Sequence, residues 1–167
     1  MPLLNFKIIS DGGYTYEGFL WAKKNGGLCY EADYPYISGE TKETGECRAD
    51  CEKDPLVAPK SYSKVERKSD RALMSAVAEL PVAVSIQADE PAFQHYKSGV
   101  FTAECGTDLN HAVLVVGYGA LDDLDFYKVK NSWGVSWGMD GYILLERGGN
   151  QKGGQCGILL QGVYPNL

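Results

Sequence analysis

The residues of this chain best suited to chemistry are a histidine and an asparagine in two neighbouring segments. His111 begins an apolar run, and Asn131 ends the next run, in which apolar and charged residues alternate. If both runs are strands, the amide oxygen of Asn131 can accept a hydrogen bond from one imidazole nitrogen, which leaves the other free to take or give a proton. Trp133 can cover this bond and strengthen it by excluding water. The pair is a candidate general base with its orienting group, although His111 alone would more simply be a structural strand histidine.

The elements that must hold this pair are strands in the second half of the chain. The run 111–118 is apolar on both faces, as a central strand is, and in 125–131 the residues Tyr127, Val129 and Asn131 share one face. Further strands are predicted over 82–87, 141–147 and 158–164, and helices over 14–25, 70–79 and 90–97. Ser69 is expected to cap the helix 70–79. Helices early and an antiparallel sheet or barrel late make the expected fold class α+β.

Composition and charge exclude several classes of protein. The chain has 167 residues, with 16 Lys and Arg against 22 Asp and Glu, so its formal net charge is −6. An acidic chain lacks the basic footprint of a nucleic-acid or anionic-membrane binder. No apolar run approaches the roughly 20 residues that span a bilayer. We therefore expect a globular protein with neither nucleic acid nor membrane insertion among its interactions, and the sequence predicts no cofactor.

The cysteines and the N-terminus give conflicting indications about compartment. The five cysteines lie in Gly-rich and polar loops, as a disulfide framework does, which indicates an oxidising compartment. The first ten residues do not have the form of a secretory signal peptide, because Lys7 interrupts the apolar stretch and no small-residue cleavage site follows. With an odd number of cysteines as well, we expect a chain that has lost its beginning. Cys47 and Cys51 have neither zinc-type spacing nor a nearby His, so no metal site is predicted.

Several motifs fall in an order that is typical of one family. They are Cys105-Gly106 with Leu109-Asn110-His111-Ala112-Val113 and Val116-Gly117-Tyr118-Gly119, then Lys130-Asn131-Ser132-Trp133-Gly134 with Trp137-Gly138 and Gly141-Tyr142, and also Tyr34-Pro35-Tyr36, Pro81-Val82-Ala83-Val84 and Cys156-Gly157-Ile158. On these motifs the sequence resembles the papain-like cysteine peptidases over nearly its whole length from Ser10 onward. Asp11-Gly12-Gly13-Tyr14 resembles the glycine pair that lines the substrate cleft of that family. The resemblance implies peptide-bond hydrolysis by a Cys-His-Asn site.

The resemblance implies a fold, and it also implies that the part of the fold that carries the nucleophile is missing. It places a remnant of the helical domain in residues 1–64, with a run unlike the family in 1–9, and an antiparallel barrel-like domain in 65–167. His111 would be the general base, Asn131 its orienting residue, and Trp133 and Trp137 walls on the leaving-group side. The family's nucleophile lies in a Cys-Gly-Ser-Cys-Trp-like run preceded by a Gln that stabilises the oxyanion, and this sequence contains neither. We therefore expect a truncated papain-like fold that is inactive by itself.

The resemblance also implies a set of substrate-binding residues. Ser85, Leu109, Asn110 and Gln161 would line the main specificity pocket, and Gly12, Gly13 and Tyr14 would form the opposite wall. Most relatives accept a bulky apolar side chain in this pocket. Because Ser85 and Gln161 are polar, we expect the base of the pocket to be more polar here.

For the cysteines, the resemblance implies that Cys105 pairs with Cys156. The other three leave a choice open, in which a Cys29–Cys51 bond would leave Cys47 as the odd thiol. Cys29 is a poor replacement nucleophile, because it follows a helix C-terminus, where the helix dipole disfavours a thiolate.

Two functions follow from these expectations. In the first, the chain is the base-bearing portion of a cysteine endopeptidase that acts on a peptide or protein once a complementary segment supplies the nucleophile. In the second, it is a non-catalytic relative that serves as a binding or structural subunit. In both, a protein partner is expected to cover the apolar surface left by the missing helix. The family implies a lysosomal, vacuolar or secreted setting.

Overall fold

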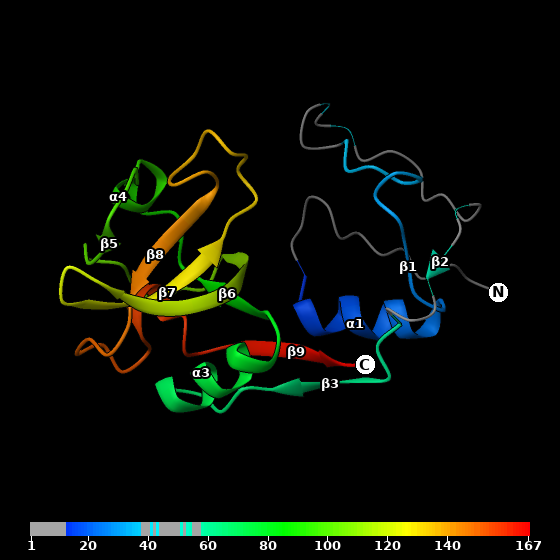
Figure 1. Ribbon diagram of the computed structural model, residues 1–167, viewed down its shortest axis with the longest axis horizontal. Coiled ribbons are helices and arrows are strands. Elements are labelled where there is room, and N and C mark those ends of the chain that lie inside the picture. The colour runs from blue at the N-terminus through cyan, green and yellow to red at the C-terminus, as the bar shows by residue number, and fades with distance from the viewer. Residues whose placement is uncertain (1–12, 38–40, 42, 44–50, 52, 55–57) are drawn as a thin grey trace. The chain divides into compact units, whose positions relative to one another are not determined.

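Seven strands form the sheet from which the candidate pair comes. The computed structural model describes residues 13–37, 41, 43, 51, 53–54 and 58–167, and the strand order is β3-β9-β4-β6-β7-β8-β5. The strands are β3 (Ser61–Lys64), β4 (Val82–Ile86), β5 (Val100–Phe101), β6 (His111–Leu121), β7 (Leu124–Lys130), β8 (Tyr142–Glu146) and β9 (Gly162–Asn166). Antiparallel pairing joins β9, β4, β6, β7 and β8 in that order, whereas β5 pairs with β8 in parallel (Figure 1). As predicted for its apolar sequence, β6 is a central strand.

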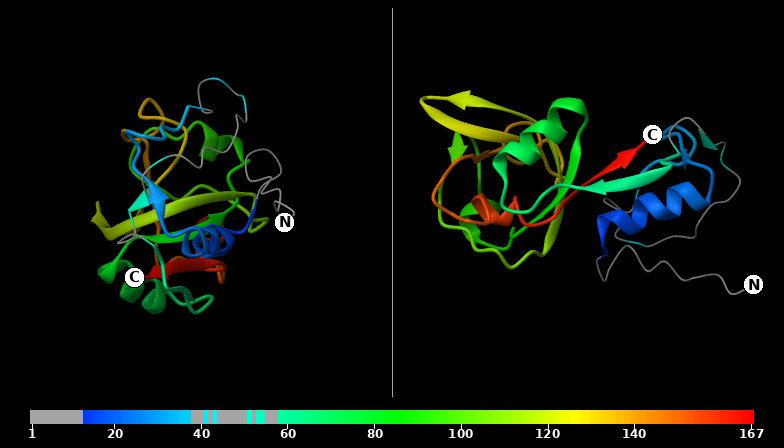
Figure 2. Two further views of the ribbon diagram at one scale, coloured as in Figure 1. Left: turned by 90° about the vertical axis from the view of Figure 1, so that its right-hand side faces the viewer. Right: turned by 90° about the horizontal axis from the view of Figure 1, so that it is seen from below.

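The chain divides into two units. Ser63–Tyr164 make up the later unit, and the residues up to Tyr62 make up the earlier one together with Pro165–Leu167. In the later unit the sheet is strongly curved, as the right-hand view of Figure 2 shows. This curvature gives the sheet one enclosed face and one outward face.

The core of the later unit lies between the enclosed face of the sheet and helix α3 (Asp70–Glu79). The fully buried side chains of the sheet come from alternate positions along each strand, and they are Val82, Val84, Ile86, Val115, Tyr127, Val129, Ile143 and Leu145. The helix adds Leu73 and Val77. Burying one such side chain stabilises the fold by roughly 1.5–3 kcal/mol. The ends of β6 and β7 are therefore anchored to a well-packed support.

Helix α3 begins where the sequence predicts, and a second contact ties that end to the sheet. The Ser69 hydroxyl accepts a hydrogen bond of 3.2 Å from the backbone N–H of Ala72, which is the expected N-cap. The Tyr127 hydroxyl donates to the Asp70 carboxylate at 2.7 Å. Burial, with this hydrogen bond as a further cause, raises the pKa of Tyr127 above its ordinary value.

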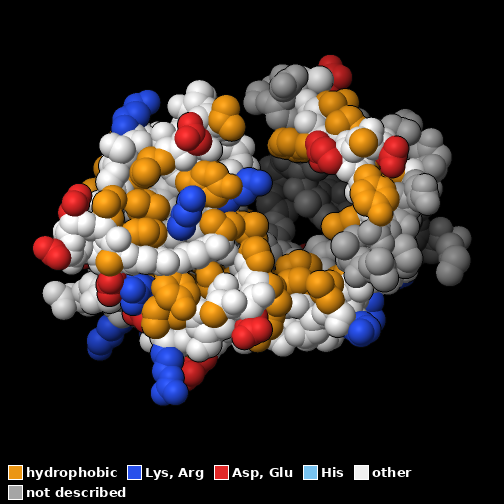
Figure 3. All heavy atoms as spheres, in the orientation of Figure 1, with side chains coloured by type: hydrophobic (Ala, Val, Ile, Leu, Met, Phe, Trp, Pro, Cys, Tyr) orange, Lys and Arg blue, Asp and Glu red, His pale blue; other side chains and the backbone are white. Residues whose placement is uncertain are grey.

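The outward face of the sheet mixes apolar and basic side chains. Tyr118, Leu121 and Leu124 of the β6–β7 hairpin are all more than one-third exposed, and Figure 3 shows hydrophobic side chains interspersed with Lys and Arg over this region. The Arg147 guanidinium lies 5.7 Å from the centre of the Tyr118 ring. Such cation–π contacts keep part of the apolar surface covered.

The earlier unit contains one described α-helix and a small two-stranded sheet. Helix α1 (Thr15–Lys24) ends at Asn25, whose side-chain amide donates to the carbonyl of Trp21 at 2.8 Å. Gly26, with a φ of 75°, then turns the chain out of the helix. Strands β1 (Leu28–Cys29) and β2 (Lys53–Asp54) are antiparallel. In the described part of the chain, no helix has the length and apolar character needed to cross a membrane.

Three predicted elements differ from the structure by more than one residue at an end. The strand predicted over 158–164 is β9, which begins only at Gly162, because the chain before it turns through the 3-10 helix η2 (Gln155–Gly157) with Cys156 at a φ of 53°. The helix predicted over 90–97 is the shorter α4 (Pro91–Gln94). Strand β6 runs past residue 118 because Asp122 and Asp123, both at positive φ, form a tight turn that continues the hairpin.

Candidate active site

The imidazole of His111 and the side-chain amide of Asn131 lie within hydrogen-bond distance. The His111 Nε2 atom is 2.8 Å from the Asn131 Oδ1 atom, and the backbone N–H of Ser132 donates to the same oxygen at 2.7 Å. A backbone N–H can only donate, so the atom facing Ser132 must be the amide oxygen rather than the nitrogen. An oxygen accepts, so Nε2 of the neutral ring carries the proton. Nδ1 is therefore the nitrogen with a free lone pair.

The strands place this pair through their register. His111 is the first residue of β6 and lies opposite Ile86 of β4, whereas Asn131 directly follows β7. The backbone N–H of Asn131 donates to the carbonyl of Gly141 at 2.9 Å, which fixes the loop between them. Asn131 is only 8% exposed, and its Nδ2 has no hydrogen-bond partner in the described structure. The position of this side chain therefore depends strongly on the two hydrogen bonds at Oδ1.

Aromatic side chains cover one side of the imidazole. The Trp133 ring lies 5.1 Å from the His111 ring, centre to centre, at an angle of 31°. Trp133 packs edge-on against Trp137 and Phe93, at 5.2 and 5.7 Å. The Trp137 Nε1–H donates to the Gln94 carbonyl at 2.9 Å. Because Trp133 is still 39% exposed, it shields the hydrogen bond on one side without closing the site.

Four residues assigned by resemblance to the main specificity pocket lie around one end of β4. The backbone N–H of Ser85 donates to the carbonyl of Gln161 at 3.0 Å, and that of Asn110 donates to the carbonyl of Ile86 at 3.0 Å. Leu109 packs close to Gly157, where an added Cβ would come within 2.8 Å of its side chain. These backbone contacts bring Ser85, Gln161 and Asn110 near the strand end that carries His111. Their contact with a substrate stays a prediction.

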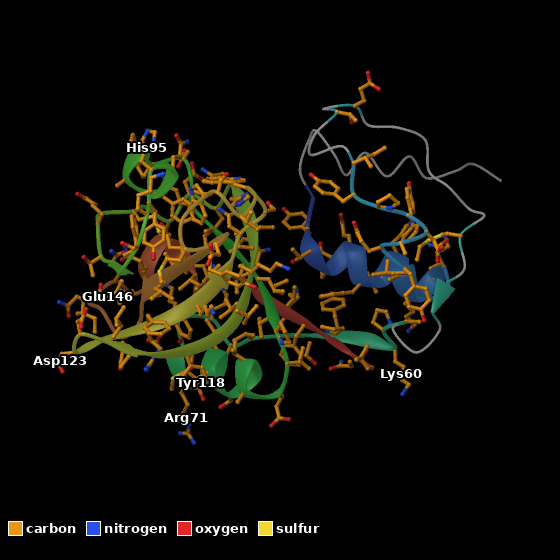
Figure 4. The ribbon with its side chains drawn as sticks, turned by 45° about the horizontal axis from the view of Figure 1, so that its top comes forward. Lys60, Arg71, His95, Tyr118, Asp123 and Glu146 are labelled. Atoms are coloured by element: carbon orange, nitrogen blue, oxygen red, sulfur yellow. A yellow bond between two sulfur atoms is a disulfide. The ribbon has the colours of Figure 1, made fainter. Side chains whose placement is uncertain are left out.

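The residues assigned to the opposite wall belong to the earlier unit. Gly13 and Tyr14 immediately precede α1, and the Tyr14 side chain is 58% exposed. Gly12 lies outside the described residues. Their role in binding a substrate backbone stays a prediction. His95, for which the sequence predicts no role, lies at the C-terminal end of α4, and its side chain is exposed (Figure 4).

A network next to His111 was not predicted from the sequence. The Asn110 Oδ1 atom accepts a hydrogen bond from the backbone N–H of Ala88 at 2.9 Å, and the Gln87 Oε1 atom accepts from that of Asp108 at 2.8 Å. The side-chain amides of both residues also interact with the Asp89 carboxylate. The hydrogen bond from Asn110, and then that from Gln87, lower the pKa of the Asp89 carboxyl. The only sequence pattern that could have indicated this network is the Gln and the Asp that flank Ala88 directly after a buried strand.

Each unit contains one of the two disulfides. Cys105 is bonded to Cys156 beside the network just described, since the Cys105 sulfur lies 3.3 Å from the Gln87 carbonyl oxygen. Cys29 is bonded to Cys51 in the earlier unit. Cys47, the thiol left over by these pairings, lies outside the described residues. No group of His, Cys, Asp and Glu side chains suited to a metal ion occurs among the residues that the structure describes.

A curved, mostly antiparallel sheet that holds an asparagine-oriented imidazole beneath a tryptophan has the base-bearing arrangement of proteases with a Cys-His-Asn site. The family model "Papain family cysteine protease" matches residues 6–166, and the chain belongs to this family. Among curated proteins, the chain is 44% identical to Cysteine proteinase COT44 of Brassica napus over 155 residues, which cover 93% of this chain and 46% of that protein. It is 42% identical to Germination-specific cysteine protease 1 of Arabidopsis thaliana, covering 93% of this chain and 40% of that protein. The chain thus spans less than half the length of these relatives.

Solved structures agree with the family assignment. The bromelain protease of Ananas comosus, in complex with the E64 inhibitor, matches with a TM-score of 0.85 and 37% identity over 93% of this chain and 70% of that chain. The ragweed pollen allergen Amb a 11, a cysteine protease solved in its proform, matches with a TM-score of 0.83 and 38% identity over 94% of this chain and 47% of that one. The expected papain-like α+β fold is therefore confirmed.

Proposed function

We propose that this chain supplies the general base and orienting residue of a cysteine endopeptidase whose thiol comes from outside these 167 residues. The observation that carries the proposal is the hydrogen bond from His111 Nε2 to Asn131 Oδ1, which leaves Nδ1 as the proton acceptor. Four of the five cysteines form disulfides and have no thiol to offer. A segment with the family's Cys-Gly-Ser-Cys-Trp-like run, in a longer form of this protein or in a second chain, would supply the nucleophile.

The reaction follows from the position of the free nitrogen. Nδ1 takes the proton of the incoming thiol, and the resulting thiolate attacks the peptide carbonyl carbon. The imidazolium then returns this proton to the nitrogen of the leaving amine as the peptide C–N bond breaks, which leaves a thioester. Water, deprotonated by the same Nδ1, hydrolyses the thioester and restores the thiol. Asn131 keeps the ring in one orientation throughout, because its Oδ1 holds the Nε2–H.

The substrate is a peptide or protein that binds in extended form. Ser85 and Gln161, which are backbone neighbours, would give the main specificity pocket a more polar base than that of most relatives. The two disulfides support an oxidising setting, and a vacuolar, lysosomal or secreted location is the one we propose.

A non-catalytic role as a binding or structural subunit is the second candidate. It is favoured by large apolar side chains that are more than half exposed in the earlier unit, at Tyr14, Leu28, Tyr30, Tyr36 and Ile37. Exposed apolar side chains that gather into a patch are typical of surfaces that a protein partner covers. In this case the partner is the functional component and His111 has no reaction to serve.

Covalent labelling with an epoxide inhibitor of papain-like enzymes distinguishes the two. The native material would be incubated with the inhibitor and analysed by intact mass. A label on the segment or chain that carries the thiol is expected, and it should be lost in His111→Ala but kept in the matched variant His95→Ala. A folded sample that takes no label anywhere would contradict the peptidase and leave the non-catalytic role.

A further inference from the structure

A carboxylate beside the candidate base is held more firmly than an ordinary surface side chain. Asp89 is exposed, and it directly follows Ala88, whose backbone N–H binds the Asn110 side chain, so its carboxylate lies close to the side-chain amides of Asn110 and Gln87. The amide oxygens of these two side chains are themselves fixed by the backbone N–H groups of Ala88 and Asp108. The two amides next to the carboxylate are therefore held in place, which limits the rotamer freedom that Asp89 loses when it binds a ligand.

This carboxylate is charged, and no cation pairs with it among the residues that the structure describes. The hydrogen bond from Asn110, followed by the one from Gln87, keeps the pKa of Asp89 below its ordinary value, so the group is ionised at neutral pH. No Lys, Arg or His of the described part of the chain forms a salt bridge with it. A fixed negative charge that faces solvent is thus open to a positively charged group from another molecule.

The place of Asp89 next to His111 indicates which part of a substrate it would meet. Asn110 binds Asp89 through its side chain and precedes His111 in the chain. From a Cα separation of about 3.8 Å and hydrogen bonds of about 3 Å, the carboxylate lies within roughly 10 Å of His111. In the proposed mechanism His111 gives its proton to the leaving amine. The residues just after the scissile bond therefore lie near His111, and a long side chain there can reach Asp89.

Resting on the proposed function, we propose that Asp89 is a specificity-determining residue that favours peptides with Lys or Arg at the first or second position after the scissile bond. Two indirect effects must be separated from a direct contact of this kind. The chain as a whole has a formal net charge of −6, which attracts any cationic peptide. Asp89 could also act only by holding Asn110, which would change the turnover of every peptide alike.

The test compares matched peptides cleaved by the protein together with the segment or chain that supplies the thiol. Three peptides differ only at the first position after the scissile bond, which is Lys, norleucine or Glu, and a second set varies the next position. We expect Lys to exceed Glu in kcat/KM by about two- to fivefold at low ionic strength in one of the sets, since exposed charge pairs contribute factors of this size. The ratio should shrink as salt is added. Asp89→Asn should bring it close to one, and Asp89→Lys should reverse it.

Asp108→Asn is the matched control, because it removes an exposed carboxylate from the same region while its backbone N–H to Gln87 remains. The control should keep the preference for Lys. Equal cleavage of the three peptides by the wild type would overturn this inference and leave the proposed function intact. Loss of the preference in Asp108→Asn, or an equal fall of all three rates in Asp89→Asn, would also overturn it. No cleavage of any peptide by the folded protein would overturn the proposed function and the inference with it.

Discussion

His111 Nε2 lies 2.8 Å from Asn131 Oδ1, across the ends of two neighbouring strands. The same oxygen also accepts the backbone N–H of Ser132, so two donors converge on it. The arrangement fixes the imidazole tautomer and the direction of its lone pair without any charged residue.

Removing the orienting amide should reduce turnover more than substrate binding. In Asn131→Ala, the imidazole can rotate and exchange tautomers, so we expect kcat of the protein with its thiol-bearing segment or chain to fall about ten- to a hundredfold with a smaller change in KM. The low-field proton resonance of the His111 Nε2–H should also disappear from the NMR spectrum. Asn166→Ala is the control, because the Asn166 amide binds the Ser61 hydroxyl and takes no part in this network. Retention of the resonance in Asn131→Ala would contradict the assignment.

The indole above the imidazole should slow exchange of that same proton with water. Trp133 covers one side of the ring at 5.1 Å, so we expect Trp133→Ala to increase the exchange rate of the Nε2–H severalfold and to lower kcat/KM. Trp133→Phe should recover part of both effects, because it keeps an aromatic ring. The measurement is saturation transfer from water to the low-field resonance. An unchanged exchange rate in Trp133→Ala would mean that the indole does not protect the hydrogen bond.

The positions of His111 and Asn131 could be predicted because strand periodicity determines them. The alternation of Tyr127 and Val129 with exposed lysines puts Asn131 in phase with the core, and the structure leaves Asn131 8% exposed. Helix α3 could be predicted to the residue, because Ser69 caps it and Pro81 follows its last turn. The roles of these residues in catalysis came instead from a resemblance, since periodicity shows where a side chain lies and not what it reacts with.

The network around Asp89 could not be predicted in the same way. It joins Gln87 and Ala88 to Asp108 and Asn110. These two segments are more than 20 residues apart in sequence and meet through strand register and loop backbone. The late start of β9 has a similar cause. An apolar sequence from Ile158 onward resembles a strand, but the disulfide at Cys156 and a positive φ there hold the preceding segment in a turn. Long-range covalent and hydrogen bonds therefore override the local pattern.

Breaking the disulfide of the later unit should destabilise the sheet. Cys105 and Cys156 are 51 residues apart in sequence, and closing a loop of that length is worth about 4 kcal/mol. We expect the double variant Cys105→Ser/Cys156→Ser to lose free energy of unfolding of this order in urea titrations followed by fluorescence of Trp133 and Trp137.

The control for that experiment is the pair Cys29→Ser/Cys51→Ser, which opens a disulfide in the earlier unit. It should leave the transition reported by the two tryptophans of the later unit nearly unchanged. If both double variants shifted this transition equally, the two units would not unfold separately, and the assignment of the stabilisation to the Cys105–Cys156 loop would fail.

The buried phenol of Tyr127 should make the later unit sensitive to alkali. Burial first, and then its hydrogen bond to Asp70, raise the pKa of Tyr127, so the folded state favours the neutral phenol. The resulting stabilisation is fully present below pH 10, the ordinary pKa of tyrosine, and is lost as the pH rises towards the folded-state value. Tyr127→Phe loses the hydrogen bond to the Asp70 carboxylate, which should cost about 1.5–3 kcal/mol at neutral pH.

The measurement compares the free energies of unfolding of the two proteins as the pH rises. Above pH 10 ionisation of Tyr127 lowers the free energy of unfolding of the wild type only, so its value should converge with that of the variant. Tyr118→Phe, at an exposed tyrosine of the same sheet, should instead follow the wild-type pH profile. Parallel profiles for Tyr127→Phe and the wild type between pH 8 and pH 11 would show that Tyr127 does not carry this dependence.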